Sequence, residues 1–154
     1  MTAITLVGER PAGVPFSKSI QVTDVETELF EVPYYKALPQ TGSLSGNQAL
    51  IDLPVLFEFS APIQVVNTDA TETISITVKI VRSNSDEAHL AFNFPVHPRD
   101  TLHISASGHH LFTGDKLFVQ ASAPTGLDLI VSGFRGQTEL DDPSAFEAWV
   151  AAQV

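Results

Sequence analysis

Apolar and polar residues alternate along much of the chain, and this alternation predicts β-strands. Residues 73–80 give the clearest case, with Ile or Val at the even positions and Thr, Ser or Lys at the odd ones. A period of two places one set of side chains in a core and the other set in water. The same period recurs over 90–94, 102–106, 117–121 and 127–131.

Short turn signals separate these segments. They are Pro-Val-His-Pro at 95–98, Thr-Gly-Asp at 113–115 and Pro-Thr-Gly at 124–126. Ala61-Pro62 interrupts another apolar stretch and predicts a bend or a bulge there. Several short strands with turns at this spacing predict a mostly β protein, an antiparallel β-sandwich of jelly-roll type.

Two other segments lack this pattern. Residues 1–19 contain the Pro- and Gly-broken run Pro11–Phe16, which predicts an extended N-terminal arm. Its apolar side chains need a surface to rest on, either the domain body or a neighbouring subunit. Residues 20–138 are the expected sandwich domain, with a long polar loop inserted at 34–53. Loops of such length are often functional or are ordered by a partner.

Residues 139–154 predict a short C-terminal helix. Asp142 before Pro143, or Ser144 with a Glu three residues later, supplies the chemistry of a helix start. Phe146 and the single Trp149 then fall on one helical face. This apolar face is expected to dock on another surface.

Composition and charge narrow the function. The chain has 154 residues, 44% of them hydrophobic and 17% charged, which suits one domain with a real core rather than a disordered segment. Acidic residues outnumber basic ones by 18 to 8, for a net charge of −10. Such a surface repels phosphate and anionic lipid, so we expect neither direct nucleic-acid binding nor membrane binding.

No signal peptide and no apolar run long enough to span a bilayer is visible in the sequence. The chain also has no Cys, which rules out a disulfide framework and a thiolate zinc site. We therefore expect a protein that is made and used in a soluble state.

Histidines are the first candidates for metal ligands. His97, His103 and the adjacent pair His109-His110 lie close in sequence, but no His-x-His pair places two imidazoles on one strand face. The cupin metal motif is also missing. The sequence therefore predicts no metal and no cofactor.

Catalytic groups are similarly scarce. The acidic clusters are Glu26 with Glu28, Asp86-Glu87 and residues 139–142. Asp86-Glu87 fits a turn and Asp141-Asp142 a helix start, and nothing in the sequence brings two carboxylates to the set separation that a hydrolase cleft needs. There is no nucleophile elbow and no phosphate-binding Gly-rich loop. We therefore expect a protein that is not an enzyme.

Aromatic and apolar residues outside the core pattern are the candidate contacts. Phe118 falls on the face opposite Leu117 and Val119, and Ile130 is also expected on an outer face. Exposed aromatic side chains anchor interfaces or stack on sugars. The candidate interface residues are Val14, Pro15, Phe16, Tyr34, Tyr35, Phe118, Phe146 and Trp149.

Several segments together carry a family resemblance. They are Phe-Glu-Val-Pro at 30–33, Val-Asn-Thr at 66–68, Phe-Pro-Val-His-Pro at 94–98, and the hairpin segments 111–122 and 126–133. In this combination the chain resembles a widespread group of small virion proteins of tailed bacteriophages. The resemblance covers roughly the central two-thirds of the chain and departs at the arm, the inserted loop and the tail.

The resemblance implies a structural component of a tailed-phage virion, made in the host cytoplasm and located in the virion. In the first place it implies a capsid decoration or accessory protein. A neck or tail accessory protein is the alternative position. The implied partners are like subunits, as a trimer or ring, and other virion proteins such as the major capsid protein. A carbohydrate- or receptor-binding β-sandwich module is the competing hypothesis from another class.

Overall fold

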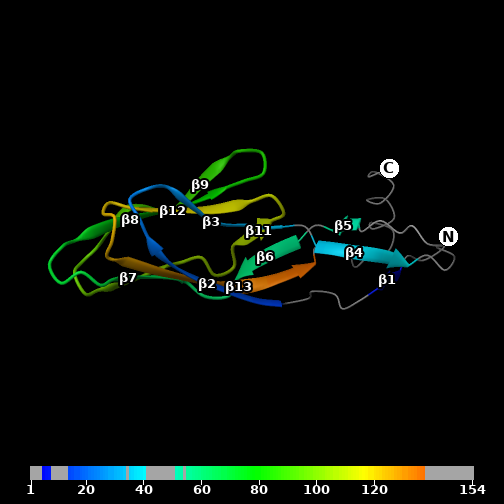
Figure 1. Cartoon of the computed structure of the whole chain (residues 1–154), viewed down its shortest axis with the longest axis horizontal. Helices are drawn as coiled ribbons and strands as arrows, with labels where there is room; N and C mark the ends of the chain where they lie inside the picture. Colours follow the sequence, from blue (N-terminus) through cyan, green and yellow to red (C-terminus); the bar gives the residue numbers. More distant parts are fainter. Residues whose placement is uncertain (1–4, 8–13, 34, 41–50, 54, 138–154) are drawn as a thin grey trace.

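The computed structural model describes residues 5–7, 14–33, 35–40, 51–53 and 55–137. These residues form thirteen strands, and no helix lies among them. All strand pairings are antiparallel. Figure 1 shows two main layers, with β3, β8 and β12 above β2, β7 and β13. The mostly β, sandwich-like fold expected from the sequence is therefore confirmed.

The upper layer, sheet I, has the order β3-β12-β8-β9. β9 is an edge strand and projects from the body of the sheet in Figure 1. The strands are β3 (Thr27–Glu31), β8 (Ile74–Val81), β9 (Glu87–Val96) and β12 (Lys116–Ala121).

The lower layer, sheet II, is built around β13. This strand pairs with β2 along one side, and with β7 and then β6 along the other. β10 continues the sheet beyond β7, and β11 continues it beyond β6. The strands are β2 (Val14–Val22), β6 (Val55–Phe59), β7 (Ile63–Asn67), β10 (Thr101–Ile104), β11 (His110–Phe112) and β13 (Leu127–Gln137).

A bend separates β6 from β7, as Ala61-Pro62 predicts. The two strands lie one after the other along β13, β6 against 133–137 and β7 against 127–130. The Ser60 amide still donates to the Ser132 carbonyl at 3.2 Å, so the break is short. Proline is tolerated here because it lies between the two strands and takes no part in the ladder.

Part of the predicted inserted loop is strand. β4 (Tyr35–Gln40) pairs with β1 (Thr5–Val7) and with β5 (Ile51–Leu53) in a small third sheet. In Figure 1 this sheet lies beyond the end of β6 and β13. Residues 34–53 thus include paired backbone at both ends of the expected loop.

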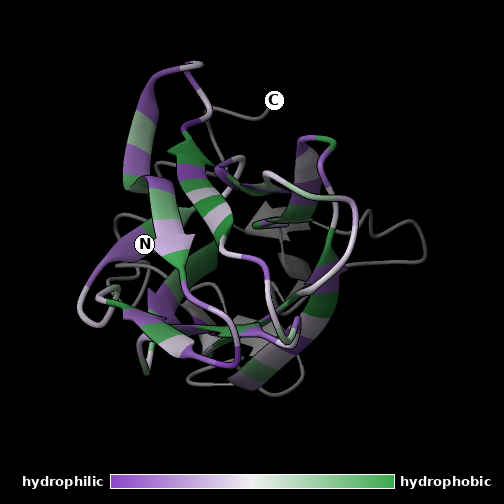
Figure 2. Cartoon of the chain, turned by 90° about the vertical axis from the view of Figure 1, so that its left-hand side faces the viewer, coloured by the Kyte–Doolittle hydropathy of each residue, from purple (hydrophilic) through white to green (hydrophobic). Residues whose placement is uncertain are grey.

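The core lies between sheets I and II and follows the period-two pattern. Every second residue of β7, β8 and β12 is buried, and Figure 2 shows the matching bands of apolar and polar residues along the strands. The largest fully buried side chains are Phe57, Phe59, Leu29, Ile63, Ile76, Leu111, Leu117, Leu127, Leu129, Val22 and Val32.

The C-terminal part of the predicted N-terminal arm, residues 14–19, belongs to sheet II. Residues 14–19 form the first part of β2 and pair in register with β13 of the same chain, from Val14 opposite Arg135 to Ser19 opposite Ile130. Of the two supports considered for the arm, the domain body is the one the structure provides for these residues. The predicted helix at 139–154 lies outside the described residues.

A buried amide fixes the end of β7. Asn67 is fully buried, and its Nδ2 donates to the carbonyls of Glu72, at 2.8 Å, and Val96, at 2.9 Å. Its Oδ1 accepts from the Asp69 amide at 2.9 Å. Three hydrogen bonds from one side chain therefore hold the turn before β8 and the end of β9 together.

We expect the Asn67→Ala variant to lose about 2 kcal/mol of unfolding free energy, because it leaves these backbone groups without their partner. Urea denaturation followed by circular dichroism measures the loss. Asn84→Ala is the matched control, since Asn84 is exposed and bonds only within its own turn. Equal losses in the two variants would contradict the role given to Asn67.

Candidate functional site

The outer face of sheet II carries an apolar patch. Phe134 on β13 lies opposite Pro15 on β2 and opposite Glu58 on β6, and Leu56 lies opposite Phe112 on β11. Directly opposed residues in an antiparallel pair point to the same side of the sheet. Phe112 is 53% exposed, Phe134 43% and Ile130 40%. We call this set the outer patch: Pro15, Leu56, Phe112, Ile130 and Phe134.

One charged pair interrupts the outer patch. Glu58 lies between Phe134 and His110, and its Oε1 is 3.8 Å from His110 Nε2. Both side chains are exposed. Ser17 faces Ser132 across β2 and β13, and the exposed Asp128 lies on the same face of β13 as Ile130, at the border of the patch. The patch is therefore an apolar surface in an otherwise acidic protein.

Three candidate residues of the arm, Val14, Pro15 and Phe16, lie in β2. Val14 begins the strand, and Pro15 is exposed in the outer patch. Phe16 points the other way and is half-buried, with its ring centroid 5.1 Å from that of Phe30 and 5.5 Å from that of Phe57. The structure therefore gives Phe16 a packing role within the chain.

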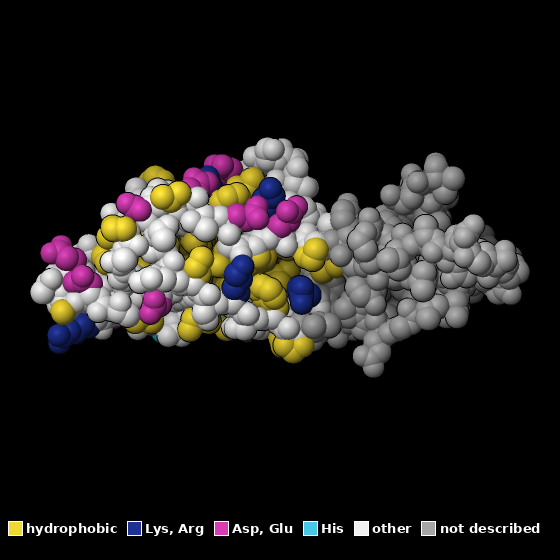
Figure 3. Space-filling view, in the orientation of Figure 1, with side chains coloured by type: hydrophobic (Ala, Val, Ile, Leu, Met, Phe, Trp, Pro, Cys, Tyr) yellow, Lys and Arg dark blue, Asp and Glu magenta, His cyan; other side chains and the backbone are white. Residues whose placement is uncertain are grey.

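The Phe16 ring helps close the side of the sandwich where the edges of the two sheets meet. The Arg135 guanidinium carbon lies 5.2 Å from the Phe16 centroid, and Lys18 Nζ donates across to the Leu29 carbonyl at 2.6 Å. Figure 3 shows apolar and basic side chains together in the middle of this side. These contacts tie β2 to β3.

The remaining candidates are spread widely. Phe118 is half-buried on the outer face of sheet I, and Tyr35 begins β4. Tyr34, Phe146 and Trp149 lie outside the described residues. Within the described part of the chain, the sequence candidates Pro15 and Phe118 therefore belong to different surfaces.

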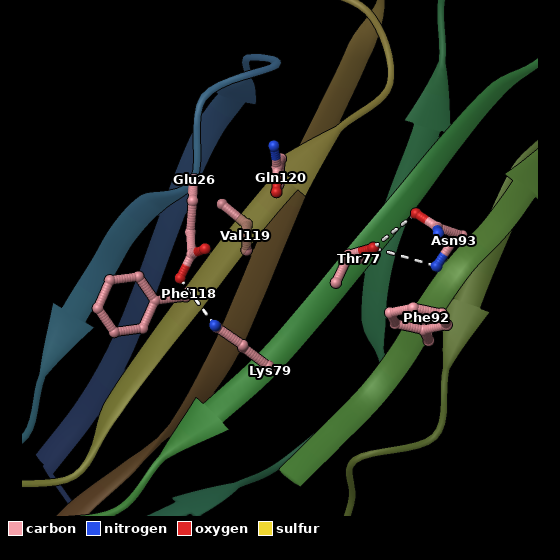
Figure 4. A pocket seen from close by; sticks show the side chains of 8 residues that line it. All are labelled: Glu26, Thr77, Lys79, Phe92, Asn93, Phe118, Val119 and Gln120. Carbon is pink, nitrogen blue, oxygen red and sulfur yellow. Dashed lines mark hydrogen bonds and ion pairs between the residues drawn. The ribbon is translucent and has the colours of Figure 1, made fainter. Parts of the chain in front are cut away.

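A hollow of about 250 Å³ lies over sheet I. Figure 4 shows Thr77 and Lys79 on β8 in its middle, with Phe118 on one side and Phe92 on the other. Its lining comes from the β2–β3 turn, β8, β9 and β12. The lining residues are Glu26, Thr77, Lys79, Phe92, Asn93, Phe118, Val119 and Gln120.

Lys79 is the charged centre of this hollow. Its Nζ lies 2.8 Å from Glu26 and 3.0 Å from Glu87, and 5.8 Å from the Phe118 centroid. The hydrogen bond to Glu26 raises the pKa of Lys79 above its usual value, with a further contribution from Glu87. Lys79 is therefore a cation at neutral pH, with its charge balanced by the two carboxylates.

A bulge in β9 brings two residues to this site that the sequence pattern did not indicate. Leu90, Phe92 and Phe94 were expected on one apolar core face, but Phe92 is 67% exposed and Phe94 is 48% exposed. The pairing of β9 with β8 shifts register after Ile76, and Asn93 has a φ of 45°. The core-face interpretation is thus wrong for Phe92, because an edge strand with a bulge does not keep a strict period of two. Leu90 still packs against the core, and Phe94 lies opposite the buried Ile76 at the open edge of the sheet.

The described ranges contain neither a metal-binding cluster of side chains nor a membrane-spanning helix. No group of three or more His, Cys, Asp or Glu residues there is placed to hold a metal ion. Within the same ranges, no helix has the length and apolar character needed to cross a membrane.

Comparisons with known proteins leave the family open. No protein-family model matches the sequence, and no curated protein matches it. A chain from the structure of infectious bursal disease virus Gx strain is a weak structural match, with a TM-score of 0.34 and 10% sequence identity. The similarity covers 92% of this chain and 34% of that one, so this chain spans about a third of its length. A likeness this distant carries no argument for function.

Proposed function

We propose that this protein is a structural component of a tailed-phage virion, acting as a capsid decoration or accessory protein that self-associates and docks on other virion proteins. A neck or tail accessory position is the alternative. The observation that carries the assembly part is the exposed outer patch on sheet II. The resemblance of the central segments to tailed-phage virion proteins supports the virion part.

The finer fold belongs to the same proposal: the sandwich is a jelly roll. With β6 and β7 taken as one broken strand, and β10 and β11 as another, each main sheet has four strands. Among the strands of these two sheets, each passes to the other sheet at the next step along the chain, except from β8 to β9. The first and last strands of the two sheets, β2 and β13, are neighbours. This order supports a jelly roll, which consists of two Greek keys folded into two sheets.

The chemistry of the outer patch favours a second copy of the chain as its partner. Burying one Phe or Ile side chain that is otherwise exposed contributes about 1.5–3 kcal/mol, and the patch offers Phe112, Ile130 and Phe134. A net charge of −10 repels like copies. Contact between copies is therefore favoured where acidic side chains are few. Glu58 lies within this patch and Asp128 at its border, and the other residues of the patch are apolar.

Self-association is tested on the full chain with Phe134→Asp. A carboxylate at this position has to be desolvated in the interface, so we expect the dissociation constant to rise at least tenfold, or about 1.4 kcal/mol. Sedimentation velocity over a concentration series measures it. Val25→Asp is the matched control, since Val25 is 67% exposed in the turn between β2 and β3, outside the patch.

Two results would overturn the proposal. A parent chain that stays monomeric at all concentrations removes self-association, and equal effects of the two variants move the interface away from the outer patch. Mass spectrometry of intact, purified particles tests the virion assignment separately, because a virion component has to be present in them.

A further inference from the structure

The hollow on sheet I is built differently from the outer patch. Its two aromatic rings, Phe92 and Phe118, flank polar groups from β8, and the side chains of Asn93 and Gln120 lie at its border (Figure 4). Small-ligand sites combine apolar rings with a few placed polar groups that fix orientation. The hollow therefore has the composition of a ligand site.

The backbone at Asn93 gives an independent reason to regard this hollow as a site. A left-handed conformation is uncommon for a non-glycine residue, and bulges often re-aim side chains beside functional sites. Thr77 holds the bulge in place: the Asn93 amide donates to Thr77 Oγ1 at 3.0 Å, and that hydroxyl donates to Asn93 Oδ1 at 3.2 Å. The fixed bulge keeps Phe92 turned outward at 67% exposure.

The side-chain amides of Gln120 and Asn93, at the border of the hollow, have hydrogen-bonding capacity left for a ligand. The Gln120 Nε2 donates to the Asp24 carbonyl at 2.9 Å, which fixes the amide. Among the described residues, no hydrogen bond engages Gln120 Oε1 or Asn93 Nδ2, leaving one acceptor and one donor at the border of the hollow. A ligand with hydroxyl groups can serve both, since a hydroxyl donates and accepts.

The local charge selects against anions. Lys79 is already paired with Glu26 and Glu87, so these three side chains together carry a net charge of −1. An anionic ligand would face the two carboxylates without a free cation to compensate. A neutral ligand avoids this penalty.

We propose that this hollow binds a neutral pyranose sugar, with one C–H face of the ring against Phe92 and the hydroxyl groups on Asn93 and Gln120. A pyranose has an apolar C–H face and a rim of hydroxyl groups, which matches an aromatic ring bordered by amides. The site is on sheet I and the outer patch is on sheet II, so sugar binding does not depend on the proposed assembly function.

The test uses the full chain and a panel of neutral methyl pyranosides, those of glucose, galactose, mannose and N-acetylglucosamine. Two-dimensional ¹H–¹⁵N NMR spectra at millimolar sugar are expected to show shifts of the amides of 77–79, 92–93 and 118–120 for at least one of them. Phe92→Ala should weaken that binding at least tenfold. The methyl glycoside of glucuronic acid should bind more weakly than that of glucose, because of Glu26 and Glu87.

Asn93→Gly is the most specific variant, because glycine adopts the left-handed backbone conformation while the side-chain amide is removed. It should reduce sugar affinity several-fold without loss of the folded spectrum. Phe134→Ala on sheet II is the control and should change the affinity less than twofold. Absence of shifts with every sugar, shifts confined to other residues, or tighter binding of the glucuronide would each overturn the proposal.

Discussion

Replacing Asp115 with alanine should lower the free energy of unfolding by about 3 kcal/mol, because a buried carboxylate with three donors is removed. Asp115 is 3% exposed. Its Oδ2 accepts from Arg82 Nη1 at 2.8 Å and from the Phe112 amide at 2.9 Å, and its Oδ1 accepts from the Ser83 amide at 3.0 Å. One side chain thus joins the β8–β9 turn to the turn before β12.

Loss of these bonds leaves two backbone amides without an acceptor and the Arg82 guanidinium without its buried partner. Arg82 is 37% exposed and can turn to water, so the expected loss lies at the lower end of the range for a broken buried pair. Urea unfolding at neutral pH measures the change. Asp128→Ala on the exposed face of β13 is the control and should stay within about 0.5 kcal/mol. A loss below about 1 kcal/mol for Asp115→Ala would contradict the structural role.

The sequence predicts the turn at 113–115 but not the hydrogen bonds of Asp115 to residues far away along the chain. Gly114 has a φ of 89°, so the turn uses a conformation that glycine adopts at little cost, as the Thr-Gly-Asp signal indicates. The partners Arg82 and Ser83 are more than thirty residues away along the chain. Turn chemistry is local, whereas this pairing depends on two turns meeting in the folded sandwich.

The strands that carry a period of two are the part of the fold that the sequence predicts well. β8 and β12 alternate between buried and half-buried residues along their whole length because each lies inside sheet I with a neighbour on both sides. β9 has a neighbour on one side only, and its bulge at Asn93 turns Phe92 to solvent. Hydrophobic pattern alone does not distinguish an edge strand from a central one.

The candidate surfaces could be predicted only in part, for the same reason. Ile130 and Phe118 stand out from the sequence because each interrupts the polar face of a strand. To place Ile130 on one surface with Phe112 and Pro15, one has to know which strands lie beside β13. To place Phe118 beside Phe92, one has to know the strand order β12-β8-β9. Strand order arises from tertiary packing, and the alternation pattern carries no information on it.

The core phenylalanines give the second large effect: Phe57→Ala should lower the free energy of unfolding by about 4 kcal/mol. The Phe57 ring is 1% exposed, and its centroid lies 5.0 Å from those of Phe30 and Phe59 and 5.5 Å from that of Phe16. It also lies directly against the backbone of Gly133, where an added Cβ would come within 2.4 Å of the ring. No neighbouring side chain at Gly133 can fill the space that the ring leaves.

Phe16→Ala should cost about 2 kcal/mol, since its ring is half-buried over Phe57, and Phe94→Ala on the edge of sheet I should cost about 0.5 kcal/mol. The three losses are compared in one set of urea titrations at low protein concentration. The order Phe57, Phe16, Phe94 is the expected result.

If Phe16→Ala cost no more than Phe94→Ala, residues 14–19 would contribute little to the stability of the domain. That result would favour an arm that contacts only neighbouring subunits. If Phe57→Ala cost no more than Phe16→Ala, the core would not be centred on this ring. The expected order instead makes the start of β2 part of the folding unit, so a truncation that tests the arm has to spare Val14 and the residues after it.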